Sequence, residues 1–151
     1  MKQRIYPDTS VIGGVYDPEF ADWSERLIQE FKDGHKIAVI SDLTLKEIED
    51  SPTDVRYILK GIPNRNKELV VLNDDAKSLA MTYMSEGAVT EKYLVDAQHI
   101  AMATIYRVDV LVSWNFKHIV NMKRIRLYNA VNLKHGYPLV EIRSPREVLY
   151  E

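Results

Sequence analysis

Apolar residues along the chain follow two patterns: short continuous runs, and longer stretches in which they recur every three or four positions. A short run is typical of a buried strand, and the wider spacing is typical of a helix with one face in the core. The runs predict strands at 4–7, 36–40, 68–72, 108–113 and 138–143. The spaced stretches predict helices at 17–34, 42–49, 52–61, 74–86, 90–107 and 116–133. This alternation predicts one α/β domain over 1–151, with a mostly parallel sheet covered by helices on both faces.

Several predicted helices carry residues that mark their ends. Asp17 and Pro18 predict a helix start, because aspartate caps free N–H groups and proline fits the first helical position. Gly34 can close that helix. Ser41 and Asn73 are capping residues at the starts of the helices that follow the second and third strands.

The composition is that of an ordinary folded protein, with 46% hydrophobic and 28% charged residues. With no cysteine, the chain has no disulfide or thiolate metal site, so any metal must be held by oxygen or imidazole. No apolar stretch approaches the roughly 20 residues of a membrane span. Asp8 also interrupts the run that follows the N-terminal basic residues, which argues against a secretory signal. We expect a cytoplasmic protein with no membrane partner.

Acidic and amide side chains occur where ligands bind in an open α/β sheet, beyond the carboxyl ends of the strands. Asp8 follows the first strand, and Asn115 follows the fourth in the sequence Ser-Trp-Asn. Glu47 lies on the helix after the second strand, and Asp96 lies near the start of the helix before the fourth. Around Asp96 we expect an apolar stripe facing the sheet, made of Leu94, Ala97, Ala101 and Ile105. A carboxylate in such a place needs a cationic partner, either an arginine or a metal ion.

Four such groups can hold one Mg²⁺ ion, or two ions bridged by an aspartate, since Mg²⁺ prefers oxygen ligands. Each has a simpler alternative: Asp8 as a turn or helix cap, Glu47 on a solvated face, and Asn115 as a helix cap. Ser10 and Ser113 are expected to hydrogen-bond a ligand carboxylate, a metal water or a phosphate oxygen, and Thr9 to turn away. His99, one turn beyond Asp96, is either a catalytic acid or base or a hydrogen-bonded structural histidine, and we favour the second.

Four segments occur in the order and at the approximate spacing of one family: DTSV (8–11), SDLTLKEIE (41–49), DAQHIAMAT (96–104) and LVSWNFKHI (111–119). Together they make the chain resemble the PIN-domain ribonucleases, which include the VapC-type toxins. The resemblance implies a three-layer α/β/α sandwich, dependence on Mg²⁺ or Mn²⁺, and endonucleolytic cleavage of RNA. It places Asp8, Glu47 and Asp96 as an acidic triad. It also implies a cognate antitoxin, if the protein is a toxin, and a homodimer.

The fourth position of the family is often an aspartate, and Asn115 stands there in this chain. One negative charge fewer predicts weaker binding of a second metal ion. In the mechanism that we hypothesise, a metal held by the triad lowers the pKa of a bound water. That water attacks the scissile phosphate in line and leaves a 3′-hydroxyl and a 5′-phosphate.

The net charge of −2 gives no overall basic field, but 115–134 contains five lysines or arginines and no acid. From this run we expect contacts to the RNA backbone, by Lys117, His118, Lys123, Arg124 and Arg126. The alternative is a solvated helix face.

Two other functions compete with the nuclease. Phosphoryl transfer to a strand-end aspartate is disfavoured, because phosphatases of that kind carry a second aspartate where this chain has Ser10. A degenerate PIN-like module that binds RNA or a protein partner without cleavage is favoured only by Asn115.

Overall fold

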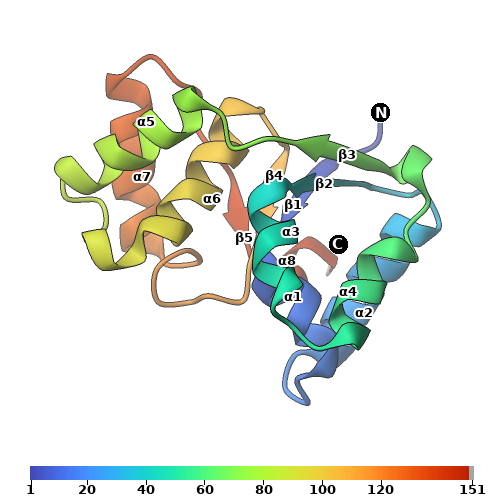
Figure 1. The fold of residues 1–151 in the computed structure, drawn as a ribbon. Helices are drawn as coiled ribbons and strands as arrows, with labels where there is room; N and C mark the ends of the chain where they lie inside the picture. The colour runs from blue at the N-terminus through green and yellow to red at the C-terminus, as the bar shows by residue number, and fades with distance from the viewer. Residues whose placement is uncertain (150–151) are drawn as a thin grey trace.

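The computed structural model describes residues 1–149, which form a five-stranded sheet between two layers of helices (Figure 1). The strands are β1 (Arg4–Pro7), β2 (Ile37–Ser41), β3 (Lys67–Val70), β4 (Val110–Val112) and β5 (Ile142–Arg143). They are ordered β3-β2-β1-β4-β5, and every pairing is parallel. The predicted parallel α/β/α sandwich is confirmed.

Each face of the sheet has its own core. One face packs against α5 (Asp74–Ser85), α6 (Leu94–Ile105) and α7 (Met122–Lys134). The other packs against α1 (Thr9–Gly13), α2 (Ala21–Lys32), α4 (Thr53–Lys60) and α8 (Pro145–Leu149). Successive strand residues point to opposite faces, so Ile5 enters the second core and Tyr6 the first. The helix α3 (Asp42–Glu49) contributes Leu43 to one core and Ile48 to the other.

The chain around α1 differs from the prediction. Asp17 does not start a helix, because it ends the 3-10 turn Gly14–Tyr16 and its carboxylate accepts from the backbone of Glu19. The helix α2 begins at Ala21 instead. The helix α1 was not predicted at all. It begins at Thr9, directly after Asp8. The Asp8 carboxylate is its N-cap and accepts a hydrogen bond from Val11 N–H.

Other element boundaries also shift. The predicted helix 90–107 is divided into the 3-10 helix Glu91–Tyr93 (η3) and α6, and Leu94 is 36% exposed, so the buried stripe begins at Ala97. The predicted helix 116–133 begins only at Met122, where Asn121 caps α7 by accepting from Arg124 N–H. The last strand is confined to Ile142–Arg143. The remaining elements are α8, which was not predicted, and the 3-10 helix Asn64–Asn66. Within residues 1–149, no helix has the length and apolar character needed to cross a bilayer.

Candidate active site

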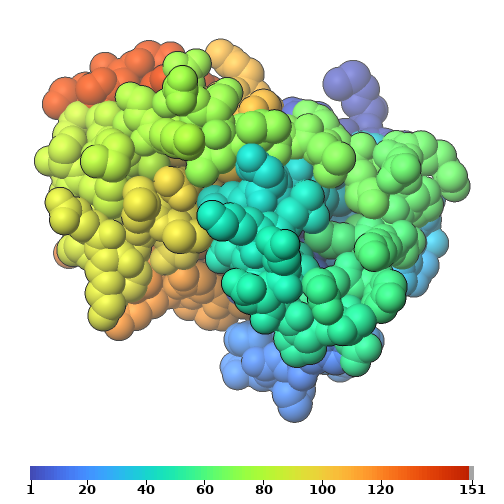
Figure 2. Space-filling model, viewed as in Figure 1, coloured from blue at the N-terminus to red at the C-terminus, as the bar shows by residue number. Residues whose placement is uncertain are grey.

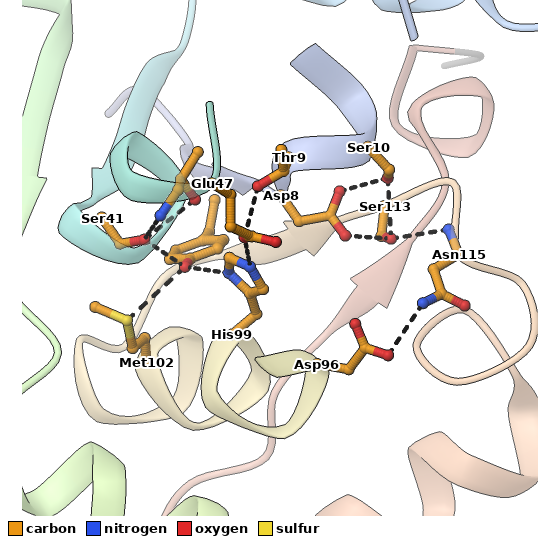
Figure 3. Close-up of polar contacts among 12 residues, drawn as sticks. Asp8, Thr9, Ser10, Ser41, Glu47, Asp96, His99, Met102, Ser113 and Asn115 are labelled. Atoms are coloured by element: carbon orange, nitrogen blue, oxygen red, sulfur yellow. Dashed lines mark hydrogen bonds and ion pairs between the residues drawn. The ribbon is translucent and has the colours of Figure 1, made fainter. Parts of the chain in front are cut away.

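Asp8 lies at the carboxyl end of β1, the central strand, and is only 5% exposed. The Ser10 hydroxyl donates to Asp8 Oδ1 at 2.5 Å, and the Ser113 hydroxyl donates to Oδ2 at 2.6 Å (Figure 3). Val11 N–H adds a longer bond to Oδ1 at 3.4 Å. The backbone N–H of Asp8 is itself bonded to Val112 O at 3.0 Å. Both predicted serines therefore contact Asp8, and together they fix the plane of its carboxylate.

The charge of Asp8 has no partner of opposite sign in the described chain. Burial raises the pKa of Asp8 above its usual value, and His99 and the hydroxyl hydrogen bonds oppose this only in part. Within residues 1–149, no lysine or arginine forms an ion pair with Asp8 or Asp96. A buried ionised carboxylate costs free energy unless a cation compensates it. Compensation of Asp8 is therefore left to a ligand.

Glu47 reaches the same region from α3 and is held through one oxygen. Its Oε1 accepts from the Thr9 hydroxyl at 2.7 Å and from His99 Nε2 at 2.6 Å. Thr9 was expected to turn away, and this is wrong, because α1 starts directly after Asp8 and carries Thr9 over α3. Burial acts to raise the pKa of Glu47, but the bonds from His99 and Thr9 outweigh it and hold that pKa below its usual value. Glu47 is therefore kept ionised.

His99 is the middle member of a buried hydrogen-bonded chain. Its Nδ1 lies 2.6 Å from the Tyr6 hydroxyl, which also lies 2.8 Å from Ser41 Oγ. Tyr6 and Ser41 are fully buried and His99 is 2% exposed. Burial raises the pKa of Tyr6 far above its usual value, so the phenol stays protonated. The structural alternative for His99 thus fits the observed contacts. It extends to Tyr6, which sequence reasoning missed, and to Ser41, which was predicted only as the cap of the helix that follows β2.

Asp96 is joined to the loop after β4 by Asn115. Asn115 Nδ2 donates to Asp96 Oδ2 at 3.3 Å, while its Oδ1 accepts from Lys117 N–H at 3.2 Å and His118 N–H at 3.0 Å. The Asn115 amide oxygen therefore caps the following turn, which agrees with the alternative of Asn115 as a cap. The role of Asn115 as a metal ligand stays a prediction. Burial raises the pKa of Asp96, and the charge of Asp8 adds to that effect. Asp8 and Asp96 are thus near enough to repel each other.

The carboxylates fit a hard divalent cation by their chemistry. Asp8 lies between β1 and α1, Glu47 on α3 and Asp96 on α6, and their carboxylates line one region at the carboxyl end of the sheet (Figure 3). Within the described part of the chain, Glu47 Oε2 and Asp96 Oδ1 accept no hydrogen bond. The same residues contain no group of three or more acidic or histidine side chains already close enough to share one metal ion. The donor types and the unbalanced charge fit Mg²⁺ or Mn²⁺, and the three carboxylates would have to move closer together to share one ion.

Glu47 also borders a cleft of about 560 Å³. In Figure 2 the teal surface of α3 meets the yellow surface of α6 on this side of the molecule. The cleft is lined from both helices, from α5 and from the segment that precedes α5, by residues that include Lys46, Leu72, Lys77 and Val95. A ligand much larger than an ion can therefore approach the Glu47 side of the site.

The predicted RNA-binding residues differ in their exposure. Lys117, Lys123 and Arg126 are exposed, and Arg124 is half-buried. The prediction put His118 on an exposed basic helix, and this is wrong. His118 lies in the loop before α7 and is 8% exposed. Its ring stacks on Tyr93 with centroids 3.5 Å apart.

No family model and no curated protein matches the chain. Among solved structures, VapC20 of Mycobacterium tuberculosis, described as a toxin that cleaves the sarcin-ricin loop, has a TM-score of 0.58 at 15% identity, over 76% of this chain and 92% of its own. VapBC2 of Rickettsia felis, bound to promoter DNA, has a TM-score of 0.61 at 11% identity, over 94% and 98%. DNA-bound VapBC of Salmonella typhimurium has a TM-score of 0.58 at 17% identity, over 96% of this chain and 99% of its own. At 11–17% identity the likeness establishes the fold, and the protein therefore has the fold of the VapC PIN-domain toxins, the group that its sequence motifs resemble.

Proposed function

We propose that this protein is a metal-dependent endoribonuclease that hydrolyses phosphodiester bonds in RNA, and that it acts as the toxin of a toxin–antitoxin pair. The observation that carries the proposal is the buried Asp8, which has no cationic partner within residues 1–149 and lies at the carboxyl end of the central strand. Glu47 and Asp96 approach it from α3 and α6. The structural likeness to a toxin that cleaves the sarcin-ricin loop supports the same chemistry.

The cation would be held by Asp8, Glu47 and Asp96. It would be Mg²⁺ or Mn²⁺, bound as one ion or as two. When bound, such an ion supplies the positive charge that acidifies water and offsets the charge of a phosphate under attack. The chain's own residues prepare that site. Ser10 and Ser113 orient Asp8, and the chain from Tyr6 through His99 keeps Glu47 ionised and in place.

The proposed partner is an antitoxin, because two of the similar structures are VapBC complexes. An antitoxin that inserts a basic side chain among the carboxylates would compensate the same unbalanced charge as the metal does. Two experiments test this part. The product of the adjacent gene should co-purify with this protein, and its co-expression should relieve the growth arrest that this protein causes.

The direct test of the nuclease is cleavage of labelled single-stranded RNA in Mg²⁺ or Mn²⁺, compared with EDTA. We expect cleavage that EDTA abolishes, and loss of cleavage in Asp8→Asn and in Asp96→Asn. Asp22→Asn on α2 is the matched control, since Asp22 is exposed and lies on a helix that contributes none of the three carboxylates. Full activity in Asp8→Asn would contradict the proposal. Binding of Mn²⁺ with no cleavage of several RNAs would favour the noncatalytic module.

A further inference from the structure

A stacked pair of rings connects Asp96 to a cationic part of the surface. Tyr93, at the end of η3, stacks on His118 with ring centroids 3.5 Å apart. His118 N–H donates to Asn115 Oδ1 at 3.0 Å, and Asn115 Nδ2 donates to Asp96. The Tyr128 hydroxyl holds the other end of His118 by donating to its carbonyl oxygen at 2.9 Å. The Tyr93–His118 stack is therefore fixed beside Asp96.

Three cations lie on the segments that meet at this stack. Lys92 Nζ lies 5.8 Å from the centre of the Tyr93 ring. Lys117 precedes His118 directly, and its N–H shares the Asn115 oxygen with His118. Arg124 comes from the first turn of α7 and donates from Nη1 to Ala88 O at 2.8 Å, which ties it to the segment before η3. Figure 1 shows that segment next to the start of α7.

The electrostatic field at His118 agrees with this arrangement. Burial is the largest cause that lowers the pKa of the His118 imidazole. The charges of Lys117, Arg124 and Lys92 lower it further, while the charge of Asp96 opposes them. All four charges therefore act on the same ring.

None of the three cations is paired with an acid in the described part of the chain, whereas Lys134 at the other end of α7 pairs with Glu86 at 2.9 Å. Like charges held near one another without acids repel, and a bound anion removes that repulsion. In addition, Nδ1 of His118 is buried and has no hydrogen-bond partner within those residues.

We propose that Lys92, Lys117 and Arg124 form a phosphate-binding edge that holds the backbone of single-stranded RNA beside Asp96. This inference rests on the proposed function and deepens it by naming which cations hold the substrate. The favoured ligand is the phosphodiester backbone, because a row of phosphates matches three cations on separate segments and Tyr93 offers an aromatic ring next to them. Lys92 is new to the site, since it lies outside the basic run 115–134.

The edge also divides the basic run. Lys123 and Arg126 are both exposed on α7. Arg126 lines a separate cavity with Ile125 and Glu147. We assign different roles to the adjacent residues Lys123 and Arg124, because Arg124 is hydrogen-bonded to Ala88 in the segment before η3.

The test is a salt titration of RNA binding, measured by fluorescence anisotropy of a labelled single-stranded RNA in EDTA so that no cleavage occurs. For single strands, log K falls with log salt with a slope of about −0.7 per phosphate contact, so each lost contact makes the slope shallower by about 0.7. We expect Lys92→Gln/Lys117→Gln to bind more weakly and to make the slope shallower by about 1.4. Adding Arg124→Gln should make it shallower by about 2 in total. The double variant keeps the Arg124 bond to Ala88, so the result does not depend on that structural contact.

Two matched variants complete the design. Lys60→Gln/Arg65→Gln, on the β3 side of the sheet, is the control and should bind RNA as wild type does. Lys123→Gln/Arg126→Gln should change the slope less than Lys92→Gln/Lys117→Gln, and the opposite order overturns the proposal. A wild-type slope in the double variant also overturns it, as does binding of an acidic peptide but not RNA at this edge. The proposal is likewise overturned if millimolar inorganic phosphate displaces the labelled RNA and the affinity for RNA does not depend on RNA length. That result would indicate a site for free phosphate rather than for the backbone.

The outcome is separate from that of the nuclease test. A protein that cuts RNA but shows no slope change in the double variant refutes only the phosphate-binding edge. A protein that shows the expected slope change and never cuts RNA refutes only the nuclease.

Discussion

Nε2 of His99 lies 2.6 Å from Oε1 of Glu47, and the opposite ring nitrogen of the same histidine lies 2.6 Å from the Tyr6 hydroxyl. One buried imidazole thus connects the hydrophobic core to a carboxylate of the candidate active site. Because Oε1 is held by His99 and Thr9, the oxygen left for a ligand is Oε2. Residues that orient a metal ligand in this way affect metal affinity and activity without touching the metal.

We predict that His99→Leu lowers RNA cleavage by about 10–100-fold and weakens Mn²⁺ binding by a similar factor. The reason is that Glu47 loses its principal hydrogen-bond donor while the Tyr6 hydroxyl loses a partner. His99→Gln, whose amide can donate to Glu47, should recover part of both losses. The measurements are kcat/KM for cleavage and the Kd of Mn²⁺, with the thermal midpoint as a check on folding. Equal losses in both variants would show that His99 serves only the packing of the core.

We predict that Mn²⁺ raises the thermal unfolding midpoint of the wild-type protein. A ligand that binds only the folded state at 100 times its Kd adds about 2.7 kcal/mol, and about 1 kcal/mol shifts the midpoint by roughly 2–4 °C in a protein of this size. Asp96→Asn should reduce the shift, because Asp96 Oδ1 accepts no hydrogen bond from the described chain and is one of the oxygens open to the ion. Asp22→Asn should leave the shift as in wild type. Calorimetry in matched EDTA and Mn²⁺ buffers measures it, and an equal shift in Asp96→Asn would remove Asp96 from the ligand set.

The sequence was sufficient to predict the sheet and the acids at its edge, because both follow from simple spacing. Apolar runs locate the strands, and parallel strands bring their carboxyl ends to one edge. Asp8 directly follows β1, and Asn115 is the third residue after the neighbouring strand β4. Glu47 and Asp96 follow from the helices that flank that edge. Those four positions needed no knowledge of side-chain conformation.

The hydrogen-bond network could not be predicted in the same way, because it depends on where short elements begin. Thr9 reaches Glu47 only because α1 starts at Thr9, and a five-residue helix leaves little periodic signal. Tyr6 could have been placed on the α6 face from strand alternation, and its hydroxyl then needs a buried partner. That it meets His99 rather than another residue of α6 depends on the register of α6 against β1, which propensity does not fix.

We predict that the ionisation of Asp8 destabilises the metal-free protein as pH rises through the titration of that carboxyl. Burial raises the pKa of Asp8 above its value in the unfolded chain. At pH values between the unfolded and the folded pKa, the folded state therefore binds more protons than the unfolded state. The free energy of unfolding then falls as pH rises and stays lower above the folded pKa. Asp8→Asn removes this loss. It should be more stable than wild type at neutral pH in EDTA, and the difference should shrink as pH falls below the usual carboxyl pKa of about 4. Urea unfolding over a pH series measures it, and a variant less stable than wild type at neutral pH would contradict the assignment of Asp8 as an uncompensated charge.

We predict that Gly14→Ala damages both stability and cleavage, although Gly14 touches none of the acids. A Cβ at Gly14 would lie 2.6 Å from Ser24 Oγ and 2.9 Å from Trp114 Nε1, two atoms that are hydrogen-bonded to each other at 2.8 Å. The new methyl group must therefore separate them and move the Trp114 side chain.

The displacement should reach the site, because Trp114 N–H donates to Ser10 Oγ at 2.9 Å and Ser10 donates to Asp8. Overpacking of this kind costs typically 1–3 kcal/mol, so we expect roughly that loss in the free energy of unfolding together with a lower single-turnover rate of cleavage at unchanged Mn²⁺ saturation. Gly13→Ala is the matched control: its Cβ meets nothing within 4 Å, and its φ of −66° is helical. It should be neutral or stabilise by about 0.4–1 kcal/mol. Chemical unfolding and single-turnover cleavage measure both variants, and equal behaviour of Gly13→Ala and Gly14→Ala would show that the contact between Trp114 and Ser24 does not support the site.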